Sequence, residues 1–348
     1  MYVPAGSAHI YRRLQLLHDL GHYYDFDYFG RFVGRAIDLD FFPPTWQDSP
    51  MKKGRWKRFK TALFLFLVAA SLWLLSSYGV AYWGTRRHRP LFPEPIPAIT
   101  WGKIESFRIT TDDREELGAW FIDGTRHRPF VLLLHGNGGR RQDCLKQAEF
   151  LTKAGFPLMM ISLRAHGDST GQINDLGYGA RLDVIAAVRW LAEKYGGRPV
   201  VVWGSSLGAA AAIFAAKDLG HQVSGYILEC PYQDLHTAVR NRTEIYLPPL
   251  LDRVAYAGLL TVSTLVLPNA DKISPIEAAA ETPGDIPVLI LAGGADRRAR
   301  PEEANAIYRR IQPQADLVIF QEADHMKLFQ TDPKQYRHIV LDFLKKVE

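Results

Sequence analysis

Residues 61–83 form a run of 23 positions without a charged side chain, and this run divides the sequence into two unequal parts. As a helix the run is about 34 Å long, enough to cross a hydrocarbon core of about 30 Å. Aromatic residues lie near its ends, as in an interfacial belt: Trp56, Trp73, Tyr78, Tyr82 and Trp83. We expect a single transmembrane helix. A buried core helix is usually shorter, and a cleavable signal peptide begins nearer the amino terminus.

Basic residues flank this run unevenly. Six precede it and three follow it: Lys52, Lys53, Arg55, Lys57, Arg58, Lys60, and then Arg86, Arg87 and Arg89. The excess predicts a cytoplasmic amino terminus, with everything after residue 90 on the opposite side of the membrane. Because much of the net charge of +5 lies here, we expect no nucleic-acid partner.

Residues 1–60 are expected to form an amino-terminal tail. His18 and His22 are spaced for one helical face, with three aspartates nearby: Asp19, Asp25 and Asp27. A metal site can be imagined there, but we interpret these side chains as ordinary polar residues and expect no metal. The two cysteines, Cys144 and Cys230, lie outside any CxxC or Cys/His pattern, so no disulfide framework or structural zinc is expected.

Residues 84–97 carry four prolines, at positions 90, 93, 95 and 97. Such spacing favours a stiff, extended chain. We therefore predict a proline-rich linker that holds the next domain off the membrane surface.

Residues 98–348 alternate between short apolar runs and helical stretches. Strands are expected over 103–111, 117–124, 129–136, 157–167, 198–206, 224–231, 287–294 and 316–323. Helices are expected over 141–154, 178–195, 207–218, 301–311 and 333–347. The pattern predicts an α/β fold, a mostly parallel sheet covered by helices on both faces. Ligands bind such sheets beyond the carboxyl ends of the strands.

The segment Gly204-Ser205-Ser206-Leu207-Gly208 joins an apolar strand to an alanine-rich helix. In a GxSxG turn the central serine is held exposed at the end of the sheet, where it can act as a nucleophile. Glycines flank it because a side chain there would collide with the neighbouring strand or helix. Ser206 is therefore the candidate nucleophile, and Ser205 occupies the variable position.

A serine nucleophile needs a base and an acid that orients the base. Asp296 follows the strand 287–294, and His325 follows the strand 316–323. The order Ser206, Asp296, His325 is that of α/β-hydrolases. Asp324 is a rival acid, but a direct neighbour is poorly placed to bond the imidazole ring.

The motif HGNGG, residues 135–139, follows the third strand, and its glycines leave backbone N–H groups accessible. We expect the amides of Asn137 and Leu207 to form an oxyanion hole. The motif lacks the lysine and serine of a P-loop and the spacing of a dinucleotide site. His166, on the next loop, is interpreted as structural.

Residues 98–348 resemble the α/β-hydrolase superfamily. HGNGG, RAHGDSTG at 164–171, GSSLG and the LxxxGxAD pattern are similar to its serine aminopeptidase-like and acyl-hydrolase branch, which includes membrane-anchored members. The resemblance implies the same catalytic Ser206, Asp296 and His325, and the same oxyanion amides. RAHG replaces the RGHG of many relatives, and ADRRARP is unusually basic, which leaves the local shape near Asp296 open.

Residues 232–286 are expected to be a lid insertion. The stretch 245–268 is apolar except for Asp252 and Arg253, and 254–268 is short for a second span. Short helices over the catalytic pocket are the expected form, and a membrane-facing lid that admits acyl chains is the alternative. Asn241-Arg242-Thr243 is a glycosylation sequon, with meaning only in a eukaryotic secretory compartment.

The sequence predicts a membrane-anchored serine hydrolase that cleaves a carboxylic ester or thioester of a small-molecule or acylated substrate, without a cofactor or metal. A serine peptidase of the aminopeptidase-like type remains an alternative within enzymes. A second alternative is a catalytically silent scaffold, because a fold does not guarantee an activity.

Overall fold

A computed structural model describes residues 50–87 and 91–348 of the chain. The tail residues His18 and His22, considered above as a metal site, lie outside the described residues. The chain divides into two compact units, Met1–Leu72 and Trp73–Glu348, and the boundary falls inside one helix.

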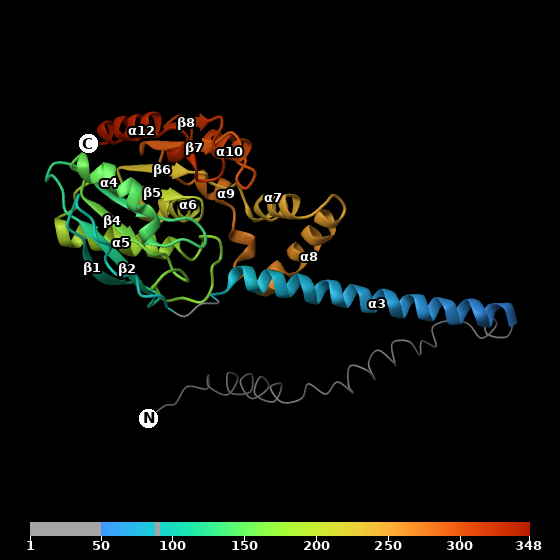
Figure 1. Cartoon of the computed structure of the whole chain (residues 1–348). Coiled ribbons are helices and arrows are strands. Elements are labelled where there is room, and N and C mark those ends of the chain that lie inside the picture. Colours follow the sequence, from blue (N-terminus) through green and yellow to red (C-terminus); the bar gives the residue numbers. More distant parts are fainter. Residues whose placement is uncertain (1–49, 88–90) are drawn as a thin grey trace, which may run out of the picture. The chain divides into compact units, whose positions relative to one another are not determined.

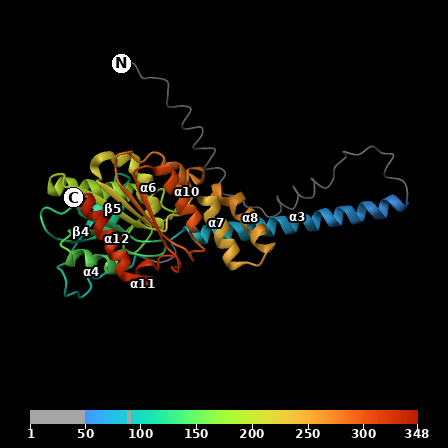
Figure 2. The ribbon, with the colours of Figure 1, turned by 90° about the horizontal axis from the view of Figure 1, so that it is seen from above.

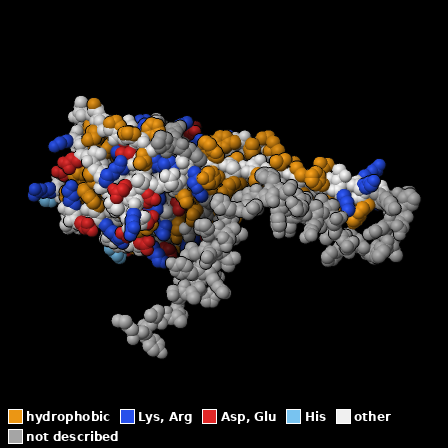
Figure 3. Space-filling model, turned by 90° about the horizontal axis from the view of Figure 1, so that it is seen from below, with side chains coloured by type: hydrophobic (Ala, Val, Ile, Leu, Met, Phe, Trp, Pro, Cys, Tyr) orange, Lys and Arg blue, Asp and Glu red, His pale blue; other side chains and the backbone are white. Residues whose placement is uncertain are grey.

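That helix, α3 (Pro50–Thr85), contains the expected run 61–83 and extends beyond it at both ends. Its segment Gly54–Thr85 is long and apolar enough to cross a membrane, and little of its apolar window is buried by protein. Basic side chains lie at its beginning and apolar ones along it (Figure 3). Within the described residues, the chain thus carries one long apolar helix consistent with a single-pass anchor.

Eight strands form one sheet in the order β1-β2-β4-β3-β5-β6-β7-β8. Their bounds are β1 Glu105–Thr110, β2 Glu116–Ile122, β3 Phe130–Leu134, β4 Leu158–Ile161, β5 Val200–Ser205, β6 Gly225–Glu229, β7 Val288–Gly293 and β8 Ala315–Phe320. β2 pairs antiparallel with both β1 and β4, and the remaining pairs are parallel. The carboxyl ends of β3, β5, β7 and β8 therefore meet along one edge.

Helices cover both faces of the sheet (Figures 1 and 2). One face packs against α5 (Arg181–Tyr195), α6 (Leu207–Leu219), α9 (Pro275–Ala279) and α10 (Pro301–Ile311). The other packs against α4 (Leu145–Lys153), α11 (Leu328–Thr331) and α12 (Pro333–Lys346). Within β3, Leu132 and Leu134 join the first layer whereas Val131 and Leu133 join the second. Burial on both faces explains why the strand reads as a continuous apolar run.

The expected helix 301–311 coincides with α10, and the other expected elements are present with shifted ends. The largest difference is the strand expected over 157–167, which ends at Ile161. Beyond Ile161 the chain turns into a polar loop whose backbone carbonyls accept hydrogen bonds from the side chain of Arg87.

In the predicted linker 84–97, the described residues 84–87 and 91–97 contact the hydrolase domain. Arg86 forms a β-bridge with Ile173, and the guanidinium group of Arg87 donates to the carbonyl oxygens of Gly167 and Gly171. The side chain of Glu94 is fully buried against Arg141. Prolines shape this segment, but buried polar contacts fix it to the domain.

The insertion 232–286 is not uniform. α7 (Leu235–Tyr246) and α8 (Leu251–Val266) form a hairpin beside the sheet (Figure 1). A short helix, η4 (Ala270–Lys272), follows, and then α9 joins the helix layer on the sheet, with Ala279 in its core. α7 also packs against α6, through a buried cluster that includes Leu235, Ala238 and Phe214.

Candidate active site

Ser206 lies between β5 and α6 with backbone dihedral angles φ 51° and ψ −106°. A residue with a β-carbon rarely adopts a positive φ. The sharp turn also requires small neighbours. A Cβ on Gly204 would lie 2.2 Å from the carbonyl carbon of Gly208, and a Cβ on Gly208 would lie 2.7 Å from the Cβ of Leu134. The two glycines allow strand and helix to touch, as expected from the motif.

The structure brings Ser206, His325 and Asp296 together. The Oγ of Ser206 lies 3.1 Å from Nε2 of His325, and Nδ1 of His325 donates to Oδ2 of Asp296 at 2.7 Å. With its Nδ1 proton held by the carboxylate, the neutral imidazole presents Nε2 as an acceptor to the hydroxyl. This is the arrangement in which a serine loses its proton to a base.

Asp296 is the acid of this set, and its other oxygen is also occupied. Oδ1 accepts from the backbone N–H groups of Arg298 and Ala299 at 2.8 and 3.0 Å, which fixes the carboxylate. The rival Asp324 accepts from the backbone N–H of His325 and pairs with Lys327 at the surface. It does not bond the ring of His325.

The loop after β3 lies beside Ser206 because β3 is the neighbour of β5 in the sheet. Leu207 is the first residue of α6, so its backbone N–H has no acceptor within the helix. On the loop, the side-chain oxygen of Asn137 accepts from Asn174 at 2.6 Å. The expected pair of oxyanion amides, Asn137 and Leu207, thus lies at the edge that carries Ser206.

His135 opens this loop and is buried. Its Nδ1 bonds the carbonyl oxygen of Gly136 at 2.7 Å, and its Nε2 accepts from the N–H of Leu163 at 3.0 Å. Both nitrogens are engaged by the backbone, so the ring is neutral, and burial lowers its pKa to about 3. His166, interpreted as structural, is also buried and bonds the carbonyl oxygen of Arg164.

A buried charge cluster, missed in the sequence, supports the same loop. Arg141 lies two residues after HGNGG, and its guanidinium group bonds the carboxylates of Glu94 and Asp168 and the hydroxyl of Ser162. The ring of Trp120 lies 4.7 Å from the guanidinium carbon. Residues from four separate segments of the chain form this cluster, so no local sequence motif predicts it.

A second buried network, which the sequence did not predict, lies next to Ser206. Ser205 donates to Glu229 at 3.3 Å, and the hydroxyl of Tyr336 donates to the same oxygen at 2.7 Å. Burial raises the pKa of the Glu229 carboxyl. The backbone carbonyl of Glu229 accepts from the N–H of Ser206 at 2.8 Å, so this network borders the strained turn.

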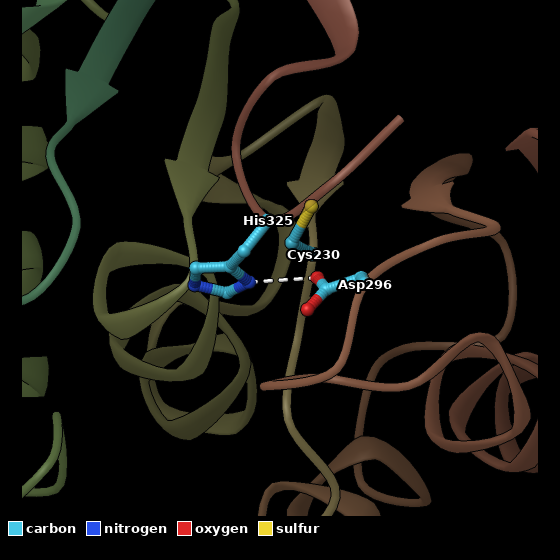
Figure 4. A group of neighbouring side chains, drawn as sticks. All are labelled: Cys230, Asp296 and His325. Carbon is cyan, nitrogen blue, oxygen red and sulfur yellow. Dashed lines mark hydrogen bonds and ion pairs between the residues drawn. The ribbon is translucent and has the colours of Figure 1, made fainter. Parts of the chain in front are cut away.

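Cys230 follows Glu229 and lies beside the acid and the base (Figure 4). Among the described residues, Cys230, Asp296 and His325 offer ligand atoms within 4.8 Å of one another, a spacing that a metal ion could use. Asp296 and His325 are already bonded to each other, so this pair is arranged for proton transfer.

A cavity of about 290 Å³ adjoins the site. The HGNGG loop lines it together with Trp203, Ser205 and Met326. Ser205 and Met326, the sequence neighbours of Ser206 and His325, line the cavity, whereas the three residues of the triad do not.

Residues 129–265 match the alpha/beta hydrolase fold family. Among solved structures, an esterase of Pyrococcus furiosus superposes with a TM-score of 0.62 at 24% identity, covering 74% of this chain and 97% of the esterase. An acylaminoacyl peptidase of Pyrococcus horikoshii superposes with a TM-score of 0.54 at 14% identity, covering 71% of this chain and 42% of the peptidase. The sheet order, the family match over residues 129–265 and these structures show an α/β-hydrolase fold. The side chains of the site have the arrangement that a serine hydrolase uses.

The chain is also similar in sequence to proteins named ABHD12B and ABHD12. Protein ABHD12B of Homo sapiens is 29% identical over 262 residues, which cover 71% of this chain and 68% of the relative. Lysophosphatidylserine lipase ABHD12 of Gallus gallus is 30% identical over 153 residues, which cover 42% of this chain and 37% of the lipase. The chain thus spans little more than a third of that lipase in the aligned region.

Proposed function

We propose that this chain is a membrane-anchored serine hydrolase that cleaves the carboxylic ester bond of a lipid through an acyl-enzyme on Ser206. One observation carries the proposal, the hydrogen-bonded series from Ser206 through His325 to Asp296. A silent scaffold has no need to keep the strained turn at Ser206 together with its two partners.

The reaction follows from the geometry. His325 takes the proton of the Ser206 hydroxyl as the oxygen attacks the ester carbonyl, and Asp296 stabilises the imidazolium that forms. The amides of Asn137 and Leu207 donate to the developing oxyanion. His325 then gives its proton to the leaving alcohol, and a water molecule, activated by the same imidazole, releases the acid from Ser206.

The substrate class is proposed from the relatives and the anchor. ABHD12 relatives are named as lysophosphatidylserine lipases, and an apolar helix holds this enzyme where such single-chain lipids reside. A thioester of an acylated molecule would undergo the same chemistry. We propose a lysophospholipid or a related single-chain ester as the substrate.

Fluorophosphonate labelling and ester hydrolysis test the chemistry in the full-length protein. Ser206→Ala should abolish labelling and lower hydrolysis of an aryl ester by roughly 10⁴-fold or more. Ser205→Ala is the matched control, since its hydroxyl bonds Glu229, and it should still be labelled. Unlabelled wild-type protein that is folded and hydrolyses no ester would instead support the silent scaffold.

A substrate panel separates the enzyme classes. Lysophosphatidylserine, lysophosphatidylcholine, a monoacylglycerol, an acyl thioester and an aminoacyl anilide should be compared with the same preparation. Preference for the single-chain esters supports the proposal. Turnover of the anilide alone would establish the peptidase alternative.

We also propose that α3 spans the membrane with its amino-terminal end in the cytoplasm and the hydrolase domain on the opposite side. The basic residues at the start of α3 support this orientation, among them Arg55, Lys57, Arg58 and Lys60. Epitope tags at the two termini and protease protection of sealed vesicles test it. An amino-terminal tag digested from outside intact cells would reverse the assignment.

A further inference from the structure

The α7–α8 hairpin exposes apolar side chains that the rest of the domain buries. In the described chain after residue 97, the strongly exposed large apolar residues all lie between positions 246 and 265: Tyr246, Leu250, Leu251, Val254 and Leu265. Leu250 and Leu265 are 71% and 74% exposed. An apolar group of this kind, confined to one hairpin, indicates a surface that contacts something other than water.

The same helix, α8, packs against the carboxyl-terminal end of α3, so the exposed apolar side chains of α8 flank this contact. A Cβ on Gly258 would lie 2.1 Å from the hydroxyl oxygen of Ser77, so the two helices touch at these residues. The indole N–H of Trp73 donates to the carbonyl oxygen of Val254 at 3.0 Å. Small residues at the contact and a side-chain hydrogen bond across it are typical of helix pairs in membranes.

A third contact joins the carboxyl-terminal ends of α3 and α8. Arg86, just after α3, donates to the carbonyl oxygen of Val266, the last residue of α8, at 2.8 Å. Arg87 and Glu94 are bonded into the domain as described above. In the described parts of the connection between α3 and the sheet, three side chains are thus bonded to the rest of the domain: Arg86, Arg87 and Glu94.

We propose that α8 is a membrane-docking helix, which lies beside the carboxyl-terminal half of α3 and enters the bilayer that α3 crosses. Its 16 residues reach about 24 Å, too short to span the hydrocarbon core alone. Leu251, Val254 and Leu265 enter the acyl-chain region. The inference rests on the proposed anchoring by α3 and adds a second point of contact.

Docking of α8 connects the bilayer to the reaction centre. On α7, the side chain of Asn241 donates to the carbonyl oxygen of Arg298, two residues after Asp296. The same amide donates to Glu303 at 2.6 Å. The hairpin that carries the membrane-docking helix is thus bonded to the loop that holds the acid.

Depth-dependent quenching tests the docking without relying on catalysis. Full-length protein in phosphatidylcholine vesicles would carry an NBD label at Leu265→Cys, Leu65→Cys or Lys345→Cys in turn. The native Cys144 and Cys230 are buried and should not compete for the label. Phosphatidylcholine with a doxyl group on the acyl chain should quench the labels at 265 and 65 at least threefold more than the label at 345.

The two labels on the apolar helices separate the possible failures. Quenching at 65 without quenching at 265 would overturn the docking of α8 and leave the anchor intact. Quenching at neither position would overturn the membrane anchor itself, and the docking with it. Neither result bears on the ester chemistry, which the Ser206→Ala comparison addresses.

A functional comparison completes the test. Replacing Leu251 and Leu265 together by serine should lower hydrolysis of a vesicle-borne lysophospholipid by about tenfold. Hydrolysis of a soluble short-chain aryl ester should stay within twofold, because neither side chain belongs to the triad. Replacing the exposed Thr261 and Thr264 of the same helix by serine is the matched control. Equal loss on both substrates would contradict a docking role.

Discussion

At the scale of single residues, the positive φ of Ser206 depends on the absence of side chains at two neighbouring glycines. Gly204→Ala places a Cβ 2.2 Å from the backbone of Gly208, so either the strand or α6 must move. We expect Gly204→Ala to lower the free energy of unfolding by several kcal/mol, as severe overpacking does, and to lower the melting temperature by roughly 10 °C.

Gly284→Ala is the control for that substitution. Gly284 has nothing within 4 Å of the added Cβ, so its melting temperature should be unchanged within about 2 °C. Thermal unfolding followed by intrinsic fluorescence measures both variants. Similar melting temperatures for the two would mean that the turn is less crowded than the distances indicate.

His135 makes the stability of the domain depend on pH. Its pKa is about 3 in the folded state because it is buried, whereas the unfolded chain takes up the proton near pH 6.5. Below pH 6.5 the unfolded state therefore binds more protons, and stability falls as the pH falls towards 3. The stabilisation of the folded domain by neutral His135, relative to acidic pH, is present in full only above pH 6.5.

His135→Gln should flatten this dependence. We expect the drop in melting temperature between pH 7.5 and pH 4.5 to be smaller in the variant by about 4–8 °C, equivalent to about 2 kcal/mol. His338→Gln is the control, because His338 is exposed on α12. An unchanged drop in His135→Gln would show that His135 is not the group responsible.

The residues of the triad could be predicted because each follows an apolar strand and the order along the chain is informative. Glu94 and Arg141, or Glu229 and Tyr336, could not be predicted in the same way. They are separated by 47 and 107 positions, and their pairing depends on how distant segments pack. Their residue types are also common on protein surfaces, so burial is what distinguishes them.

At the scale of elements, the close contact between α8 and the carboxyl-terminal end of α3 requires a small residue at Gly258. Gly258→Val would bring a branched side chain against Ser77 and Trp73 and should separate the two helices. We expect limited proteolysis in the turn between α7 and α8 to become at least fivefold faster. Ala257→Val, one position away on the exposed side, should leave the rate unchanged.

Strands and core helices could be predicted from apolar periodicity because burial on the sheet fixes it. The segment 84–97 and the insertion could not. Four prolines indicated an extended chain but not what it lies against, and the contacts of Arg87 and Glu94 depend on the loop 166–171. In the insertion, α9 joins the core through a few small apolar residues such as Ala279, too few to distinguish it from a lid helix.

The sequon Asn241-Arg242-Thr243 also has a different meaning in three dimensions. The side chain of Asn241 is 1% exposed and its amide donates to Glu303 and to the backbone. A glycan cannot be attached to this nitrogen in the folded domain. The residue instead joins α7 to the loop of Asp296.

At the scale of the whole molecule, the segment after the anchor is a structural part of the enzyme. Glu94→Ala removes a partner of the buried Arg141 and leaves Asp168 to neutralise it alone. Loss of one partner of a buried ion pair costs about 3–5 kcal/mol, so we expect a melting temperature lower by about 6 °C or more. Glu322→Ala, at an exposed position, is the control and should change little.

Activity should follow stability in that comparison, because Arg141 supports the loop that carries Asn137. A Glu94→Ala protein with wild-type melting temperature would contradict the role assigned to the pair. Glu94→Gln, which keeps the shape and a hydrogen-bonding oxygen, should recover part of the loss.

The ion pair between Glu94 and Arg141 affects what happens when a protease cleaves the segment between the anchor and the catalytic domain. Many surface enzymes are shed when a protease cuts the stalk between anchor and catalytic domain, and the freed domain keeps working. Here a cut after Glu94 would detach from the polypeptide a side chain that the interior requires. We expect a cut after Glu94 to inactivate this hydrolase, whereas a cut between Thr85 and Glu94 would leave the buried pair intact.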